Sequence, residues 1–223
     1  MICDVIATGS QGNAVALDDK ILIDCGVPYK RIDHIVPTLQ LVLLTHRHAD
    51  HFNPATIKRL HKERPTLRFG CGDWMVPYLL EAGVSPLVID IYRVPVGYAP
   101  IYKYLAGDII VQPVLLFHDV PNCGYRINIG QKRVLYATDT STLDHVNAKA
   151  FDLYLIEANH TEDEIADRIQ RKQDAGEYVY EHRVERTHLS RESADAWLAM
   201  NAGRNSEIIY LHQHKEPTPK GEK

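Results

Sequence analysis

The sequence has few cysteines and no cysteine pair that could build a metal site or a disulfide framework. The four cysteines, Cys3, Cys25, Cys71 and Cys123, lie far apart, and none belongs to a CxxC motif. No apolar run approaches the roughly 20 residues of a membrane span. The N-terminus has neither a basic region nor a small-residue cleavage site. We therefore expect a cytoplasmic protein with reduced thiols that neither spans a membrane nor is secreted.

An excess of positive charge is also missing. The net charge of -4 argues against a generally basic nucleic-acid binder, although it leaves a local basic groove open. The chain shows no internal repeat, low-complexity block or linker. Its 223 residues are enough for one domain with a real core. We expect this domain to cover residues 1–214 and a polar C-terminal tail to cover residues 215–223.

Histidine is the residue type that stands out, because many of the 12 histidines lie beside Asp or another His. Leu41–Leu44 is a continuous apolar run, as expected of a strand buried on both faces, and the residues after it are mostly His and Asp. His46 and His48 are two residues apart, so on an extended loop their imidazoles point the same way and can hold one ion. Asp50 and His51 follow too closely to share that ion and favour a second ion nearby.

Four further apolar strands also end at His or Asp. They are Leu115–Phe117 before His118, Arg133–Tyr136 before Asp139, Leu153–Ile156 before Glu157 and His160, and Ile208–Leu211 before His212. Ligands at strand ends are rigidly placed, while the loops leave a metal open to substrate. Alternatives remain at three positions: His118 could be merely hydrogen-bonded, Asp139 could cap a turn or helix, and His214 competes with His212.

The remaining elements are predicted from turn and capping signals. Further strands are expected at Ile2–Ile6, Ala14–Leu17 and Ile21–Ile23, and a hairpin turn at Gly130-Gln131 joins Tyr125–Ile129 to Arg133–Tyr136. Helices are expected from an Asn53 cap to about Leu60, from Trp74 to about Ala82, from Thr161 to about Gln173, from about Tyr178 to Thr187, and from a Ser190 cap to about Met200.

The HxHxDH signature after a buried strand resembles the metallo-β-lactamase superfamily, and the chain is similar to that superfamily throughout. The resemblance implies an α/β fold, the αββα four-layer sandwich, with two divalent metal ions. It implies that His46, His48 and His118 bind the first metal, that Asp50, His51 and His212 bind the second, and that Asp139 bridges the two. Histidine-rich ligands favour zinc, and the two aspartates also suit manganese.

Within the superfamily, the chain is most similar to the WalJ/YycJ group of exonuclease-like proteins. The matching pieces follow one another in order and span most of the chain: Gly9–Asn13, the HxHxDH set, Phe117-His118-Asp119, Thr138-Asp139-Thr140, Glu157–His160 and His188-Leu189-Ser190. The resemblance implies a hydrolase of phosphodiester bonds, with a nuclease acting on DNA or RNA as the favoured activity. A homodimer is a family-level expectation.

The resemblance also implies a mechanism. Two divalent cations outweigh two carboxylates and a bridging hydroxide, so the site would attract an anionic phosphodiester. The bridging hydroxide would be the nucleophile and Asp50 would orient it. His188 would stabilise charge or donate a proton near the leaving group, unless its role is structural. Glu157 and His160 are expected to orient ligands through hydrogen bonds. Arg47 either adds positive charge at the rim or is a solvated loop residue.

Other activities are compatible with the same ligands. A cyclic-nucleotide phosphodiesterase is the alternative within phosphodiester chemistry, and a thioester or lactone hydrolase uses the same ligand set. An oxygen- or NO-reducing diiron protein is disfavoured, because His48 stands where that branch carries Glu and no flavin domain follows. A non-catalytic binding module would have lost ligands, and all seven are present.

Overall fold

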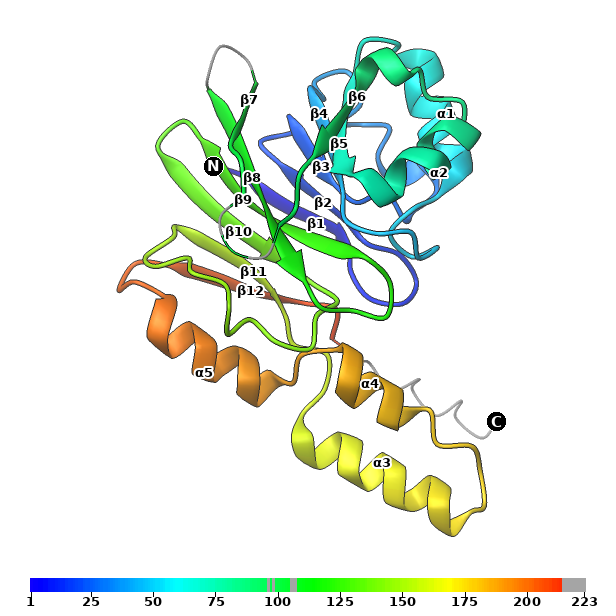
Figure 1. Cartoon of the computed structure of the whole chain (residues 1–223), viewed down its shortest axis with the longest axis vertical. Helices are drawn as coiled ribbons and strands as arrows, with labels where there is room; N and C mark the ends of the chain where they lie inside the picture. The colour runs from blue at the N-terminus through cyan, green and yellow to red at the C-terminus, as the bar shows by residue number, and fades with distance from the viewer. Residues whose placement is uncertain (96, 98, 105–107, 214–223) are drawn as a thin grey trace.

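Two stacked β-sheets form the centre of the molecule (Figure 1). The computed structural model describes residues 1–95, 97, 99–104 and 108–213, so His214 and the expected tail at 215–223 lie outside the described residues. The first sheet contains, in spatial and chain order, β1 (Cys3–Ala7), β2 (Ala14–Leu17), β3 (Ile21–Ile23), β4 (Leu41–Leu44), β5 (Arg68–Gly72) and β6 (Ile89–Tyr92).

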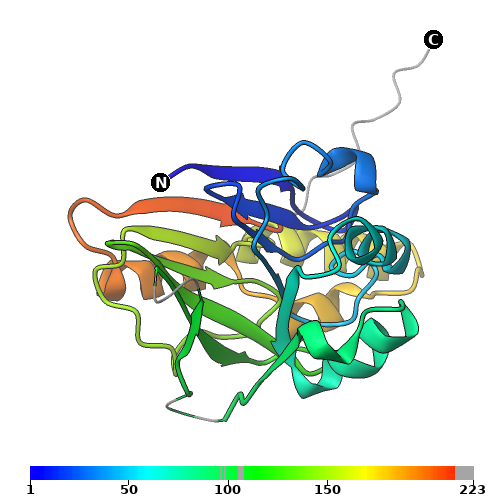
Figure 2. The same ribbon diagram turned by 90° about the horizontal axis from the view of Figure 1, so that it is seen from above.

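The second sheet has its strands in the reverse order, starting from the last strand of the chain. Its order is β12 (Glu207–Leu211), β11 (Leu153–Glu157), β10 (Lys132–Ala137), β9 (Asn122–Ile129), β8 (Ile109–Leu116) and β7 (Tyr102–Tyr104). The turn at 130–131 joins β9 to β10 as the hairpin predicted from the sequence. Strands β1 and β12 approach each other at one side of the molecule, where the His212 amide donates to Thr8 Oγ1 over 2.7 Å (Figure 2).

Strand β4 shows how the sheets bury both of their faces. Its side chains alternate, because successive residues of a strand point to opposite faces. Leu41 and Leu43 pack in the core between the two sheets, and Val42 and Leu44 pack in the core under the N-terminal helices. All four side chains are fully buried, which explains the uninterrupted apolar run in the sequence.

Helices cover the outer face of each sheet and complete four layers. Helices α1 (Pro54–Glu63) and α2 (Val76–Glu81) lie over the first sheet, together with the short 3₁₀ helices η1 (Tyr29–Arg31), η2 (Asp73–Met75) and η3 (Pro86–Val88). Helix α5 (Arg191–Asn201) packs Trp197 and Leu198 against the second sheet. The αββα sandwich expected from the sequence is thus confirmed.

Helices α3 (Glu162–Asp174) and α4 (Glu181–Thr187) project from this sandwich, and we call residues 161–187 the α3–α4 arm (Figure 1). A capping box begins α3, because the Thr161 hydroxyl accepts from the Glu164 amide while the Glu164 carboxylate accepts from the Thr161 amide. Lys172 of α3 forms a 2.7 Å ion pair with Glu181 of α4, which links the two helices. Within the described residues, no helix is long and apolar enough to cross a membrane.

Candidate metal centre

The predicted ligands come together because the strands that carry them run in the same direction within each sheet. Strand β10 is parallel to β11, which is parallel to β12, while β9 is antiparallel to both β8 and β10. Strands β8, β10, β11 and β12 therefore end at one edge of the second sheet. The β4 loop of the first sheet reaches the same place. Residues far apart in the sequence thus surround one cavity of about 390 Å³.

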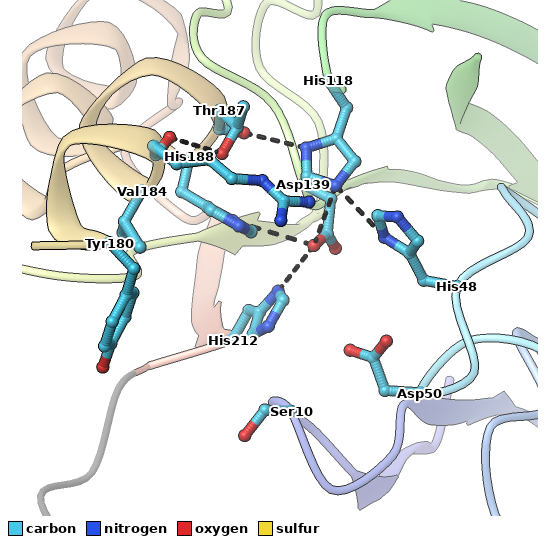
Figure 3. A pocket seen from close by; sticks show the side chains of 11 residues that line it. Ser10, His48, Asp50, His118, Asp139, Tyr180, Val184, Thr187, His188 and His212 are labelled. Carbon is cyan, nitrogen blue, oxygen red and sulfur yellow. Dashed lines mark hydrogen bonds and ion pairs between the residues drawn. The ribbon is translucent and has the colours of Figure 1, made fainter. Parts of the chain in front are cut away.

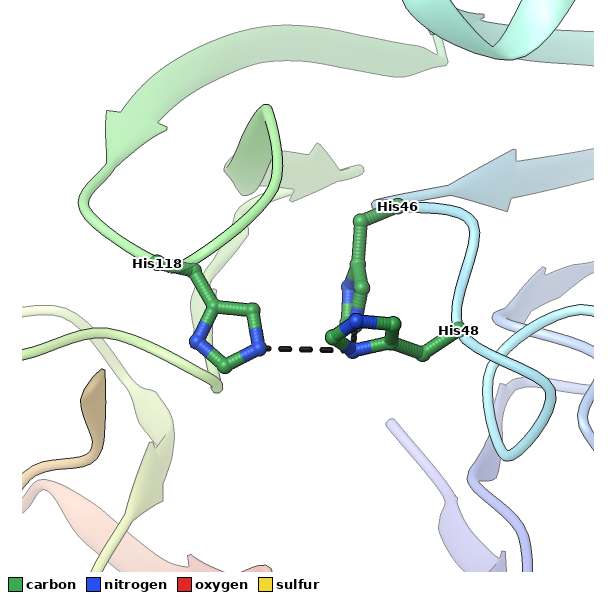
Figure 4. A group of neighbouring side chains, drawn as sticks. All are labelled: His46, His48 and His118. Atoms are coloured by element: carbon green, nitrogen blue, oxygen red, sulfur yellow. Dashed lines mark hydrogen bonds between the residues drawn. The ribbon is translucent and has the colours of Figure 1, made fainter. Parts of the chain in front are cut away.

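His46, His48 and His118 form one group of candidate ligands, with their rings converging (Figure 4). His48 Nδ1 lies 3.1 Å from His46 Nε2 and 3.4 Å from His118 Nε2. A tetrahedral ion with Zn–N bonds of about 2.0–2.1 Å places its ligand atoms about 3.3 Å apart. Burial lowers the pKa of each of the three imidazoles, so they are neutral at pH 7, which is the form that binds metals.

The outward nitrogens of these rings are held by neighbouring groups. His118 Nδ1 lies 3.0 Å from the Thr187 carbonyl oxygen, which can only accept, so Nδ1 carries the proton and Nε2 keeps a free lone pair. His46 Nδ1 lies 3.0 Å from the Thr45 hydroxyl. His48 Nε2 lies 3.4 Å from Asp119 Oδ1, and Asp119 is ion-paired with Arg183 of α4. These contacts to the nitrogens that face away from the other two rings therefore fix the orientation of each ring.

Asp139 stands between this group and the remaining candidate ligands. Asp139 Oδ2 lies 3.1 Å from His51 Nε2, and Asp139 Oδ1 lies 3.0 Å from His212 Nδ1. Burial alone would raise the pKa of Asp139, but His51 and His212 hold it well below its usual range. Asp139 Oδ2 and His212 Nδ1 are buried and have only these ion-pair contacts, without a geometrically formed hydrogen bond among the described residues, as expected of atoms that face a metal ion. The residues present therefore fit a metal centre.

Two candidate ion sites share Asp139. His46 and His51 place ligand atoms within 4.8 Å of the Asp139 carboxylate and of each other, and the same holds for Glu157, His188 and His212. Asp50 lies nearby, with Oδ2 3.5 Å from His51 Nε2. Asp139, which belongs to both groups, is in the position expected of a bridging carboxylate.

Asp24 is a candidate positioning residue that was not predicted from the sequence. Its carboxylate is fully buried, lies 2.7 Å from His51 Nδ1 and accepts hydrogen bonds from the Thr45 amide and the Tyr136 hydroxyl. It therefore turns His51 Nε2 toward the centre. Burial alone would lower the pKa of His51, but Asp139 and Asp24 raise it well above its usual range. Asp24 follows the apolar strand Ile21–Ile23, so the strand-end pattern could have found it.

Asn13 and Gly26 hold the loop that carries Asp50 and His51. Asn13 Nδ2 lies 2.8 Å from His51 Nε2 and donates to Asp50 Oδ2 over 3.2 Å. A Cβ atom on Gly26 would stand 1.7 Å from the Asp50 carbonyl oxygen, so only glycine allows this approach of the two backbones. These contacts were not predicted from the sequence.

His188 is oriented by the buried carboxylate of Glu157. Glu157 Oε1 lies 2.6 Å from His188 Nδ1, and Glu157 Oε2 accepts hydrogen bonds from the Thr140 and Leu189 amides. Burial alone would lower the pKa of His188, but the Glu157 carboxylate raises it. His160 is more remote from the ligands: its Nδ1 lies 3.4 Å from Asn159 Oδ1, and the Asn159 amide group donates to the His212 carbonyl oxygen.

Opposite sides of the cavity carry different residues (Figure 3). Val184, Thr187 and His188 lie on one side, and His48 and Asp50 lie on the other. The full lining is Ser10, His48, Asp50, His118, Asp139, Tyr180, Arg183, Val184, Thr187, His188 and His212. Arg47 does not line this cavity: it is exposed and lines a separate cavity beside Phe52, Tyr78 and Glu81, which supports the alternative of a solvated loop residue.

Fold and site together define an α/β sandwich with a histidine- and aspartate-rich centre suited to metal ions. The family model of the Beta-lactamase superfamily domain matches residues 19–212, and the chain therefore belongs to this superfamily. A search of curated proteins by sequence found no match.

Several solved structures share the fold. The short form of human tRNase Z matches with a TM-score of 0.72 at 14% identity, covering 96% of this chain and 92% of that chain. The metallo-beta-lactamase fold protein YhfI from Bacillus subtilis matches with a TM-score of 0.66 at 19% identity, covering 95% and 85% of the two chains. Zn²⁺-bound PqqB from Methylobacterium extorquens matches with a TM-score of 0.62 at 14% identity, covering 96% and 89%.

Proposed function

We propose that this protein is a dinuclear metal-dependent phosphodiesterase, that its favoured substrate is a nucleic acid, and that within its superfamily it belongs with the WalJ/YycJ-like nucleases. The observation that supports this most is the convergence of two histidine- and aspartate-rich groups, joined by Asp139, on one open cavity. The free thiols of Cys3, Cys25, Cys71 and Cys123 suit the reducing cytoplasm.

We assign the ligands of the two ions as the sequence predicts, with zinc as the favoured metal. His46, His48 and His118 would hold one ion, while Asp50, His51 and His212 would hold the other, with Asp139 shared. When bound, the ions supply Lewis-acid polarisation and an activated water. Their charge also suits an anionic substrate better than a neutral ester.

His188 and Asp50 would act on opposite sides of the substrate, His188 as the proton donor and Asp50 as the group that orients the attacking water. Glu157 binds the Nδ1 side of His188, so Nε2 is the nitrogen that can give a proton to a leaving group. The Glu157 carboxylate raises the pKa of His188, which favours the protonated form that a general acid requires. Asp50 lies on the opposite side of the cavity, where its carboxylate would orient the attacking water (Figure 3).

The choice of phosphodiesters over thioesters and lactones has further support. A diphosphatase from the PhnP family, like tRNase Z, shares the fold, with a TM-score of 0.59 at 14% identity over 95% of this chain and 86% of that chain. The names of both proteins denote hydrolysis of phosphate-containing substrates. We therefore place this chain in the same branch of chemistry.

The test is a substrate panel on protein loaded with Zn²⁺ or Mn²⁺. Bis-p-nitrophenyl phosphate and DNA or RNA should be hydrolysed, chelator should abolish turnover, and a thioester and a lactone should remain intact. His46→Ala should be inactive, whereas Arg47→Ala, a matched control in the same loop, should keep wild-type activity. Turnover of the thioester or lactone without turnover of any phosphodiester would contradict the proposal. Cleavage of cyclic nucleotides alone would replace the nuclease with the cyclic-nucleotide alternative.

A further inference from the structure

The α3–α4 arm forms one wall of the metal cavity although it belongs to none of the four layers. Tyr180, Arg183, Val184 and Thr187 come from α4 or the residue before it, and all four line the cavity with the metal ligands. Figure 3 places Tyr180 at the outer end of this wall. A wall built from an added element, beside a centre built from the sheets, is suited to recognising the substrate.

Tyr180 has the properties of a stacking platform. It is the only aromatic residue other than histidine among the described residues that line the cavity, and 45% of its surface is exposed. Lys172 Nζ lies 3.7 Å from the centre of its ring and also pairs with the buried Glu181. The ring is therefore held at the cavity while much of its surface stays open.

Arg183 adds hydrogen-bond donors beside this ring. Its guanidinium pairs with Asp119, and 65% of its side chain is exposed. A guanidinium carries five N–H donors, and one carboxylate cannot engage all of them. Arg183 can therefore also donate to a phosphate oxygen that reaches the metal centre.

We propose that Tyr180 stacks on an unpaired base next to the phosphate held at the metal centre, which makes single-stranded nucleic acid the substrate class. This inference rests on the proposed function, since it places the phosphate among the metal ligands. A duplex keeps its bases stacked and paired, so they cannot reach Tyr180, whereas every unpaired base offers a face to an aromatic ring. The net charge of -4 gives little general attraction for a polyanion, so a stacking contact supplies binding that charge does not.

The test measures binding of a fluorescent oligothymidine with phosphorothioate linkages to the metal-loaded protein by anisotropy. Tyr180→Ala should weaken binding by about 5- to 150-fold, the range for loss of one stacked base. Tyr180→Phe should bind like the wild type, because it keeps the ring. Tyr178→Ala is the matched control, since Tyr178 lies in the same arm, is 87% exposed and is not among the residues that line the cavity. Tyr180→Leu serves if circular dichroism shows that the alanine variant is unfolded.

Two further ligands make the outcome specific. An abasic strand of the same length should bind equally to the wild type and to Tyr180→Ala, and the paired duplex should bind more weakly than the single strand. Equal binding of the single strand by Tyr180→Ala and the wild type would overturn the inference, as would an equal loss on the abasic strand. Hydrolysis that does not depend on Tyr180 would overturn this inference but not the proposed function. A lack of phosphodiester hydrolysis with either metal would overturn the proposed function instead.

Discussion

Three residues around the metal centre adopt a left-handed backbone conformation. Asp24, Asp139 and His212 have φ angles of 58°, 59° and 53°, and each lies within two residues of the end of its strand. Non-glycine residues rarely adopt such angles, although Asp and His do so more often than most. Strain of this kind costs about 1–3 kcal/mol per residue and persists where the surrounding structure enforces it. Asp139 and His212 line the cavity, and the Asp24 carboxylate lies behind it, against His51 Nδ1.

Seven ligands could be predicted because histidine and aspartate at the end of an apolar strand are conspicuous. Asp24 follows the same kind of strand, but no histidine stands beside it in the sequence, and its partner His51 is 27 residues away. Asn13 likewise contacts Asp50 and His51 only through the tertiary fold. Residues that orient ligands are therefore harder to predict than the ligands, since their partners are set by sheet packing.

Replacing Asp24 should weaken metal binding without touching a ligand. Asp24→Ala leaves His51 without the carboxylate that orients it, so we expect the second ion to bind about 10- to 100-fold more weakly, the usual effect of losing such a partner. Titration calorimetry with Zn²⁺ on the metal-free protein measures this change. Asp33→Ala, which removes an exposed carboxylate, is the control. Wild-type affinity for both ions in Asp24→Ala would show that Asp24 does not position His51.

Replacing His188 should separate chemistry from metal binding. His188→Ala should keep two ions and lose about 10²–10⁴ in rate on a nucleic acid, because a nucleotide hydroxyl is a poor leaving group that needs a proton. Hydrolysis of bis-p-nitrophenyl phosphate should change little, because p-nitrophenolate leaves without a proton. Steady-state rates and metal analysis check both points. Equal losses on the two substrates would indicate a role in charge stabilisation, and loss of metal would make His188 a ligand.

At the scale of elements, strands with uninterrupted apolar sequences were predicted accurately. β2, β3 and β4 have the expected bounds, and three helices begin where expected, at the predicted caps Asn53 and Ser190 and at Thr161. β5, β6 and β7 were not predicted, because β5 contains two glycines and the other two are short with polar residues.

Strand β8 begins earlier than predicted, at Ile109 instead of Leu115, and it contains Pro113, a residue that is disfavoured inside a sheet. The sheet topology shows why this proline is tolerated. β7 pairs only with Ile109–Val111, so β8 is an edge strand on that side at Pro113. Pro113 therefore pairs with Tyr125 of β9 alone, in keeping with the confinement of proline to edge strands, and such pairing cannot be deduced from the sequence of one strand.

A single methyl group should displace the loop of the HxHxDH motif. Gly26→Ala would place Cβ 1.7 Å from the Asp50 carbonyl oxygen, so the loop must move and carry Asp50 and His51 with it. We expect loss of the second ion and a lower melting temperature, measured by metal analysis and calorimetry. Gly203→Ala is the control, because its Cβ would lie 3.2 Å from the nearest atom, a side-chain carbon. A Gly26→Ala protein with both ions and wild-type stability would contradict this view of the loop.

At the scale of the whole molecule, the metal centre joins the two sheets. The first sheet supplies His46, His48 and His51 through the β4 loop, and the second sheet supplies His118, Asp139 and His212. Each ion would therefore link both halves of the sandwich, in addition to the apolar core between them. Metal binding and folding should be thermodynamically coupled, because the unfolded chain has no such arrangement of ligands.

Chelation should lower the melting temperature. A ligand at about 100 times its dissociation constant stabilises the folded state by about 2.7 kcal/mol, which corresponds to roughly 5–10 °C in a protein of this size. Differential scanning calorimetry with Zn²⁺ and with chelator should show this difference, and added Zn²⁺ should restore it. A melting temperature that does not respond to metal would contradict the coupling of the two sheets through the centre.

The most direct test of the dinuclear centre is the metal content of the purified chain and of its Asp139→Ala variant. The wild type, prepared without chelator or reloaded with Zn²⁺, should contain about two ions per chain by plasma mass spectrometry. Asp139→Ala should lose most of both ions, because one carboxylate serves both sites. One ion or none in the reloaded wild type would contradict the account, and so would an Asp139→Ala protein that loses only one ion and stays active.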